Sequence, residues 1–443
     1  MDTENSYNNA LDYLYGFVDY SLKHTSELVK AEFNLDRMFD LMKLLGNPEH
    51  NYPILHVAGT KGKGSTSAFL ACALKQAGFT TGLYTSPHLQ DFCERIQING
   101  KPVSHSELAD LVEYIKPEVE KIPFITTFEL TTALAFLYFA RKGVNVAVIE
   151  VGLGGRLDAT NIVQPLVSII TSLSMDHTAV LGNTLELIAG EKAGIVKEGI
   201  PVVSSPQKKE ALLVLEKIAQ QRSSKLFLVG KDWMYSSGSR SLQGQDMEVW
   251  QPGGEHVKLY IRMLGAHQVQ NAATAYAGLQ VANQSGLKIT NANIQQGFSQ
   301  TFWPARFEIA RAEPPVIMDS AHNQDSANKL HDTLREYFPG RKVILIFGAS
   351  EDKDVAGMFK EWKPCLSRII LTHADHPRAL DPGQLAILAQ DNGIPCEIVF
   401  PVEAALEKAL SISAETGEIV LSAGSMFVSA EVRTAWQKIQ AGL

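Results

Sequence analysis

Lysine and hydroxyl side chains follow a short apolar stretch in a glycine-rich segment, residues 56–66 with the sequence HVAGTKGKGST. Glycines here let backbone N–H groups turn inward around phosphate oxygens, and the positive end of a following helix adds to the same field. Lys63 can reach the β- and γ-phosphates of ATP, and the hydroxyl of Ser65 can bind Mg²⁺. The segment therefore predicts a nucleotide site. The residues expected to surround the phosphates are Gly59, Thr60, Lys61, Gly62, Lys63, Gly64 and Ser65.

The spacing departs from the generic phosphate-loop pattern G-x-x-x-x-G-K-[ST]. Only Thr60 and Lys61 separate the first two glycines, and Gly64 stands between Lys63 and Ser65. A glycine turn before a helix with incidental lysines is the alternative interpretation. We favour the phosphate loop because strand, turn, lysine, hydroxyl and helix occur in that order.

Glu150 is a carboxylate at the end of an apolar stretch, where burial is costly unless the charge meets a cation. The glycines of the next segment, residues 152–161 with the sequence GLGGRLDATN, bring backbone close to a ligand. A dinucleotide fingerprint is disfavoured because position 157 is leucine and no helix-forming run follows. Local sequence alone favours a structural role for His177 and an exposed helical position for Lys192.

The composition is that of a globular enzyme, with 443 residues, 45% apolar residues and a formal net charge of −8. No long basic run is present, so we expect no nucleic-acid partner, and an anionic substrate needs a locally positive pocket. Four scattered cysteines without CxxC spacing disfavour disulfides and a zinc site. The polar amino terminus is unlike a secretory signal, and the apolar stretch 130–140 is too short to span a bilayer. We expect a cytoplasmic protein without a membrane partner.

Strand and helix patterns alternate along the chain, which predicts an α/β fold with a mainly parallel sheet. Residues 54–58 form a predicted strand before the glycine turn, and a helix is expected from about Ser65 to Ala77. Residues 295–306 contain a glycine and a proline and form the predicted junction. We expect an ATP-binding domain over residues 1–300 and a smaller Rossmann-like α/β domain over residues 301–443.

The segment GTKGKGST resembles the phosphate loop of the Mur ligase superfamily, specifically of its folylpolyglutamate synthase/dihydrofolate synthase family. The common form there has asparagine where Lys61 stands, although lysine also occurs in the folate branch. Further segments resemble that family in the same order, from about residue 25 to the carboxyl terminus. The phosphate loop lies near residue 60, which leaves too little chain for the uridine-nucleotide-binding domain of cell-wall Mur ligases.

The resemblance implies a magnesium site. Its expected ligands are Ser65, Ser86, Glu150, His177 and Lys192, the last as a carbamate formed with CO₂, which converts a cation into an anionic ligand. Lys63, Lys192, His177 and Glu150 are the implied catalytic residues.

The resemblance also implies a folate site on the first domain. Its residues are Ser86, Pro87, His88, Thr127, Phe128, Glu129, Leu157, Asp158 and Ala159. Two local alternatives remain open here: a simple Ser-Pro turn at Ser86, and a helix start with Thr127 as the N-cap and Glu129 in the first turn.

Other resembling segments concern ATP and the incoming amino acid. Asn271 is expected at the adenine, and Arg306 and Asp319 at the nucleotide, with alanine at position 305 where the family usually has glycine. His322 and Ser425 are expected on the amino-acid side.

The resemblance implies a monomeric ATP-dependent ligase that joins L-glutamate to a folate-type carboxylate, dihydropteroate or a reduced folylpolyglutamate, through an acyl phosphate. The alternatives are another Mur-type amino-acid ligase acting on a different carboxylate, and a nucleotide-driven switch. A switch lacks a reason for His177 and Lys192, and it would hydrolyse ATP without a carboxylate and an amine.

Overall fold

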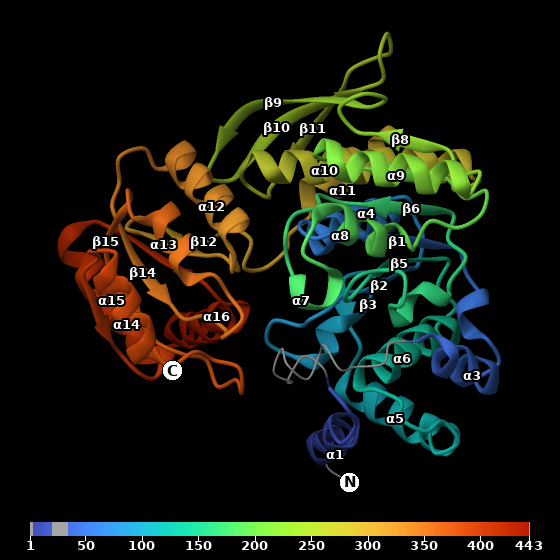
Figure 1. Cartoon of the computed structure of the whole chain (residues 1–443), viewed down its shortest axis with the longest axis horizontal. Helices are drawn as coiled ribbons and strands as arrows, with labels where there is room; N and C mark the ends of the chain where they lie inside the picture. Colours follow the sequence, from blue (N-terminus) through green and yellow to red (C-terminus); the bar gives the residue numbers. More distant parts are fainter. Residues whose placement is uncertain (1–2, 20–33, 443) are drawn as a thin grey trace. The chain divides into compact units, whose positions relative to one another are not determined.

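The structure is a computed structural model that describes residues 3–19 and 34–442 (Figure 1). The chain divides into two compact units, each made of three segments. Unit 1 comprises Met1–Gly238, Asp246–Ile261 and Gln268–Thr301, and unit 2 comprises Ser239–Gln245, Arg262–His267 and Phe302–Leu443. The beginning of the family resemblance near residue 25 lies outside the described residues.

A mainly parallel sheet forms the centre of unit 1. In the part of the chain that the structure describes it has eight strands, in the order β4-β3-β2-β5-β1-β6-β7-β8. Within the described residues, β3 pairs antiparallel with both β2 and β4 at one edge, and the other pairs of this sheet are parallel. The strands are β1 (Ile54–Ala58), β2 (Thr81–Tyr84), β3 (Ile96–Ile98), β4 (Lys101–Pro102), β5 (Val146–Glu150), β6 (Val167–Ile170), β7 (Val202–Ser204) and β8 (Leu226–Leu228).

The central strands β1 and β5 are buried at every position, as expected of parallel strands covered on both faces. The α-helices of this part are α1 (Thr3–Tyr15), α3 (Asp36–Leu44), α4 (Lys63–Gln76), α5 (His105–Val119), α6 (Thr127–Arg141), α7 (Thr178–Leu181), α8 (Leu185–Ala193), α9 (Lys209–Gln221), α10 (Ala266–Gln284) and α11 (Asn291–Gln300). Short 3₁₀ turns are η1 (Pro48–His50), η2 (Phe92–Arg95) and η3 (Ala159–Ile162). Helix α4 packs against β1, β2 and β5, so the chain after the glycine turn returns directly over the sheet.

The polar stretch that follows β8 forms a small sheet in the order β11-β10-β9. Its strands are β9 (Met234–Ser241), β10 (Gly244–Trp250) and β11 (Val257–Ile261). Strands β9 and β10 are consecutive in the chain and adjacent in this sheet, so they form a hairpin.

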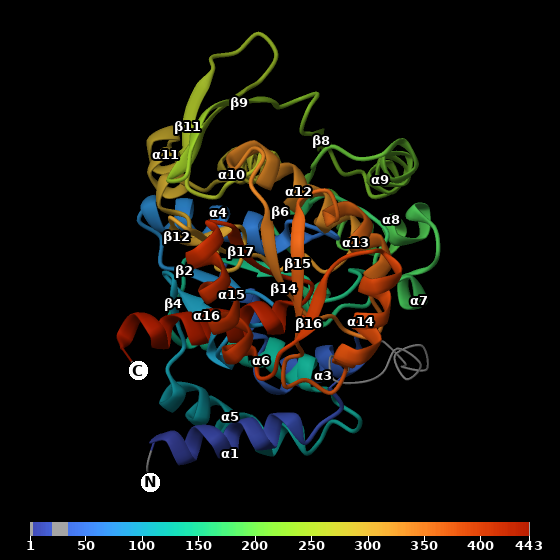
Figure 2. The ribbon, with the colours of Figure 1, turned by 90° about the vertical axis from the view of Figure 1, so that its left-hand side faces the viewer.

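Unit 2 contains a second α/β sheet in the order β12-β13-β17-β14-β15-β16, and most of its strands are labelled in Figure 2. Its strands are β12 (Glu308–Ala312), β13 (Pro315–Met318), β14 (Val343–Phe347), β15 (Leu366–Leu371), β16 (Cys396–Ile398) and β17 (Ile419–Ala423). Its helices are α12 (Gln324–Tyr337), α13 (Val355–Trp362), α14 (Pro382–Asp391), α15 (Val402–Thr416) and α16 (Met426–Ala441).

Alternation along β14 explains why helices cover both faces of this sheet. Leu345 and Phe347 join a cluster with α12, α13 and α14, whereas Ile344 and Ile346 join one with α15 and α16. Because successive side chains of a strand point to opposite faces, an uninterrupted apolar strand requires a helical layer on each side. The α/β fold class predicted from the sequence is confirmed. Every helix in the described ranges is too short or too polar to cross a membrane.

Candidate active site

Two glycines shape the phosphate loop between β1 and α4. Gly62 is the N-cap of α4 at φ 88°, and a Cβ atom there would lie 2.2 Å from Oδ1 of Asn271. At Gly59, with φ 153°, a Cβ atom would lie 1.8 Å from Oγ1 of Thr171. Larger side chains are therefore excluded by backbone conformation and by space. Helix α4 begins at Lys63, two residues before the predicted start, so the loop is shorter than expected.

Backbone and side-chain contacts attach this loop to the segment after β6. The amides of Thr60 and Lys61 both donate to the carbonyl of Ser172 at 3.0 Å. The ammonium of Lys61 lies 2.8 Å from Oδ2 of Asp176. Asp176 was assigned no role from the sequence, although its position one residue before His177 was the available signal. This ion pair places the phosphate loop next to the segment that contains His177.

Lys192 is buried in α8, with 4% of its surface exposed, so the expectation of an exposed helical lysine from local sequence is wrong. Burial and then the positive charge of Lys63 lower the pKa of Lys192 to about 7. The carboxylates of Asp176 and Asp158 oppose that shift, and the charge of Lys61 reinforces it. These side chains thus form a cluster with three amino groups and two carboxylates, which gives an acidic chain a locally basic region.

Oxygen donors are present at the carboxyl ends of β2 and β5. Glu150 ends β5 with only 5% exposure, and its Oε2 lies 3.4 Å from the amide of Ser86, which follows β2. Ser65 is buried in the first turn of α4, and the adjacent Thr66 hydroxyl is buried without a hydrogen-bond partner. Carboxylate and hydroxyl oxygens are the donors that Mg²⁺ prefers, so these residues fit a magnesium ion.

His177 has a left-handed backbone, φ 49°, and caps α7. Its side chain is 43% exposed, and its amide donates to Oδ1 of Asp176 at 3.0 Å. His177 therefore lies beside Asp176, while Ser86 and Glu150 form a separate contact.

The start of α6 differs from the alternative considered for Thr127. Thr126, not Thr127, is the N-cap, in a capping box with Glu129. The Thr127 hydroxyl donates instead to the carbonyl of Leu14 at 2.9 Å. Glu129 is buried and accepts from Nε of Arg37 at 3.0 Å. These contacts hold the beginning of α6 in a defined position.

Phe128 joins this segment to the glycine loop after β5. A Cβ atom on Gly152 would lie 2.5 Å from the Phe128 ring, so glycine permits the ring to pack on the loop backbone. Asp158 caps η3 and accepts from the amides of Leu153 and Thr160 at 2.9 and 3.0 Å. Burial raises the pKa of the Asp158 carboxyl. Asp158 thus fixes the loop that carries its neighbours Leu157 and Ala159.

The segment after β2 continues from Ser86 through Pro87 to His88. Nδ1 of His88 accepts from Nε of Arg95 at 2.9 Å. Burial and then the charge of Arg95 lower the pKa of His88 to about 3, which keeps the ring neutral at physiological pH. The contact holds this segment against η2.

Unit 2 gathers its predicted residues around the carboxyl ends of β13 and β17. Asp319 follows β13 and accepts from the amides of Phe307 and Ala321, both at 2.8 Å. Burial raises the pKa of Asp319, and the charge of Arg306 acts in the opposite direction. Ala305 has φ 51°, which explains physically why glycine is favourable at that position.

His322 and Ser425 are on neighbouring strand ends. Nδ1 of His322 lies 2.8 Å from the carbonyl of Ser320, and Ser425 caps α16. The amide of Gly424 donates to the carbonyl of Ala321 at 2.7 Å, joining the segments that carry the two side chains.

Sequence comparisons agree with this arrangement. Residues 57–279 match the Mur ligase middle domain, and residues 305–426 match the Mur ligase glutamate ligase domain. The dihydrofolate synthase/folylpolyglutamate synthase of Bacillus subtilis is 34% identical, over 97% of this chain and 98% of that protein. The folylpolyglutamate synthase of Lacticaseibacillus casei is also 34% identical, over 81% of this chain and 89% of that protein.

Solved structures give the same result. Mycobacterium tuberculosis folylpolyglutamate synthase complexed with ADP superposes with a TM-score of 0.90 at 31% identity, covering 98% of this chain and 99% of that chain. A folylpolyglutamate synthase from Thermotoga maritima gives a TM-score of 0.84 at 33% identity, covering 99% and 98% of the two chains. With its fold, both ligase domains and nearly its whole length in common with these proteins, the chain belongs to the folylpolyglutamate synthase/dihydrofolate synthase family of Mur ligases.

Proposed function

We propose that this protein uses ATP to join L-glutamate to a folate-type carboxylate, dihydropteroate or a reduced folylpolyglutamate. The cluster of Lys61, Lys63 and Lys192 around Asp176, beside the glycine-rich loop, is the observation that carries the proposal. A related structure supports the proposal: a folylpolyglutamate synthase that is 30% identical to this chain is bound there to the nucleotide AMPPCP and to folate.

The first step activates a carboxylate, which by itself is a poor acyl donor. An oxygen of the substrate carboxylate attacks the γ-phosphorus of ATP, the bond to the β-γ bridging oxygen breaks, and ADP leaves. Loop N–H groups and the Lys63 ammonium supply positive charge where phosphoryl oxygens accumulate negative charge. The products of this step are an acyl phosphate and ADP.

The second step forms the amide. The uncharged amine of glutamate attacks the acyl carbon, phosphate leaves with the bonding electron pair, and the amine loses a proton to solvent or phosphate. We assign His322 and Ser425 to the glutamate side, and Arg306 and Asp319 to the nucleotide. Asn271, beside Gly62, is assigned to the adenine base.

Magnesium is expected on Ser65, Ser86 and Glu150, with His177 and a modified Lys192 as the remaining ligands. Bound there, the ion would neutralise phosphate charge during transfer. The folate segment is assigned to Pro87, His88, Thr127, Phe128 and Glu129, together with Leu157, Asp158 and Ala159. In that assignment Thr127, Glu129 and Asp158 act by positioning, because their polar atoms already bond to protein groups.

Lys192 is proposed to carry a carbamate. A pKa of about 7 leaves a large fraction of the amine uncharged at neutral pH, and the uncharged amine can attack CO₂ with release of one proton. Lys61 and Lys63 favour the resulting anion. Carbon-13 NMR of protein equilibrated with labelled bicarbonate should show a carbamate signal that is lost in Lys192→Ala. A signal that persists in that variant would refute the assignment.

The rate of phosphate release from ATP tests whether the phosphate loop is the catalytic ATP site. Lys63→Ala should reduce the rate at least a hundredfold without loss of fold, because Lys63 lies at a helix start and only half-buried. Lys75→Ala, an exposed position on the same helix, is the matched control. Near-normal turnover in Lys63→Ala would rule out this loop as the catalytic ATP site.

Substrate identity is tested by supplying ATP, Mg²⁺ and glutamate with dihydropteroate or with reduced folates. At least one pteridine should support phosphate release that requires glutamate. Failure of all pteridines, with turnover of another carboxylate, would favour the alternative Mur-type ligase. ATP hydrolysis independent of both a carboxylate and an amine would favour a nucleotide switch.

A further inference from the structure

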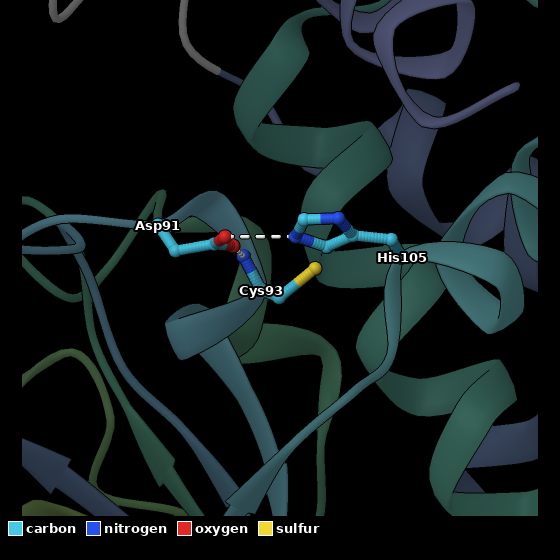
Figure 3. Close-up of side chains that lie close together, drawn as sticks. All are labelled: Asp91, Cys93 and His105. Atoms are coloured by element: carbon cyan, nitrogen blue, oxygen red, sulfur yellow. Dashed lines mark hydrogen bonds and ion pairs between the residues drawn. The ribbon is translucent and has the colours of Figure 1, made fainter. Parts of the chain in front are cut away.

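Three potential metal ligands converge in unit 1 on residues that the proposed ligase reaction does not use. Asp91 caps η2, Cys93 lies within η2, and His105 is the first residue of α5. Figure 3 shows their side chains turned toward one another. One ligand atom from each lies within 4.8 Å of the other two. Side chains this close can also form a purely hydrogen-bonded cluster, and the surroundings of each group distinguish a metal site from such a cluster.

The thiol of Cys93 has polar surroundings although the residue is only 2% exposed. It interacts with the carboxylate of Asp91 and with the hydroxyl of Tyr7, and it is subject to the charge of Glu107. The thiol is therefore placed where a cation would be electrostatically favoured.

His105 has the two contacts expected of a metal-binding imidazole. Its Nε2 lies 2.8 Å from Oδ2 of Asp91, and its Nδ1 lies 3.3 Å from Oε2 of Glu4. A histidine that binds metal through one ring nitrogen commonly donates its other N–H to a carboxylate, the role available to Glu4. The Tyr7 ring stacks on the imidazole, with the ring centroids 3.7 Å apart and an angle of 2° between the ring planes. This stacking fixes the plane of the imidazole.

We propose that Asp91, Cys93 and His105 bind a thiophilic divalent cation of the zinc class, with the Tyr7 hydroxyl or water as a fourth ligand. A thiolate, an imidazole and a carboxylate are donors that zinc accepts and that magnesium does not select. Ligand atoms around tetrahedral zinc lie about 3.5 Å apart, so small side-chain movements would close the present arrangement. Binding displaces the proton between Asp91 and His105 and the thiol proton of Cys93, and both protons are released to solvent.

The position of the site determines both how a cation reaches it and which elements a bound cation would hold together. The side chains of Asp91 and His105 are 40% and 34% exposed, which leaves a route from solvent to the buried thiol. Tyr7 and Glu4 belong to α1, whereas the three ligands belong to η2 and α5. A bound ion would therefore fasten α1 to the edge of unit 1 that carries β3 and β4.

The test uses the full chain, treated with a chelator and then held in excess Mg²⁺ so that oxygen-rich sites are filled. Titration with Co²⁺ should produce a near-ultraviolet thiolate-to-cobalt absorption that saturates at one equivalent and disappears on addition of Zn²⁺. Cys93→Ser should abolish the absorption. His105→Gln, which keeps an amide donor for Asp91, should weaken binding at least tenfold. Cys72→Ser, at a half-buried thiol of α4, should leave both unchanged.

Absence of the absorption in the unaltered protein, or its persistence in Cys93→Ser, would overturn the proposal. If Cys93→Ser does not fold by circular dichroism, the half-exposed His105→Gln decides the question alone, and unchanged cobalt affinity would then overturn it. These readouts do not depend on ligase activity.

Discussion

The ammonium of Lys61 and the carboxylate of Asp176 lie 2.8 Å apart and join two loops that are 115 residues apart in the chain. Their side chains are only 15% and 10% exposed, so neither charge is well solvated. Removing one partner of such a pair leaves a poorly compensated charge. Here that charge would lie beside Lys63 and Lys192.

Asp176→Asn should consequently lower kcat for phosphate release at least tenfold and raise the KM for ATP. The double variant Lys61→Asn/Asp176→Asn should recover part of the loss, since it removes both charges of the pair. Steady-state kinetics on the two variants measures the coupling. An Asp176→Asn enzyme with unaltered kcat would show that the pair is structural only.

A comparison of Gly62 with Gly78 separates the effect of backbone strain from the effect of a steric clash. Their φ angles are 88° and 89°, so alanine is equally strained at each, but only Gly62 faces Asn271. We expect Gly62→Ala to abolish detectable ATP binding by calorimetry. Gly78→Ala, at the end of α4, should cost about 1 kcal/mol of stability and leave binding intact. Equal ATP affinity in the two variants would contradict the proposed role of the Gly62–Asn271 contact.

The Arg37–Glu129 pair should control the start of α6. Arg37→Gln leaves a buried carboxylate without its cation, which we expect to cost about 3 kcal/mol in urea unfolding. It should also raise the KM for the folate-type substrate more than the KM for ATP, because Thr127 and Phe128 follow the same cap. Arg37→Gln/Glu129→Gln should recover most of the stability. A change confined to the KM for ATP would contradict the positioning role.

Glu49 should make stability depend on pH. Burial raises the pKa of this carboxyl, and its Oε2 is buried without a hydrogen-bond partner. Because the folded protein holds the proton more tightly than the unfolded chain, stability falls as pH rises from the unfolded pKa through the folded pKa. Glu49→Gln should therefore be close to neutral near pH 4 and stabilising by about 1 kcal/mol near pH 7.

Urea unfolding at the two pH values measures this difference. Glu216→Gln, at an exposed position of α9, is the control and should behave like the unaltered protein at both. A stabilisation of Glu49→Gln that is larger at the lower pH would reverse the predicted sign.

The sequence predicted features that depend on neighbours along the chain. The apolar run 54–58, the glycines that follow it and the helical pattern from Ser65 onward determine the order of β1, loop and α4 locally. That local inference needs no knowledge of distant pairing. Placing Ser86 with Glu150 came instead from the family resemblance, and the structure adds that the two residues lie at the carboxyl ends of the parallel strands β2 and β5.

Features that depend on distant pairing could not be predicted in the same way. Lys192 has the sequence context of an exposed helical lysine, and only the packing of α8 shows that it is buried. The Arg37–Glu129 pair spans 92 residues and has no local signature. The N-cap of α6 lies one residue before the position considered from the sequence, because Thr126 and Thr127 are equally suitable caps. The Thr127 hydroxyl donates to the distant carbonyl of Leu14, which leaves Thr126 as the cap.

The interleaved segments of the two units have a consequence for synthesis on the ribosome. The chain changes unit five times, and Ser239–Gln245 and Arg262–His267 belong to a unit whose remaining residues begin at Phe302. Gln245 donates to the carbonyls of Met263 and Gly265 and accepts from the hydroxyl of Tyr337. Those early segments therefore emerge before their later partners exist. Expression of residues 302–443 alone should give a fragment that aggregates unless the two missing segments are supplied.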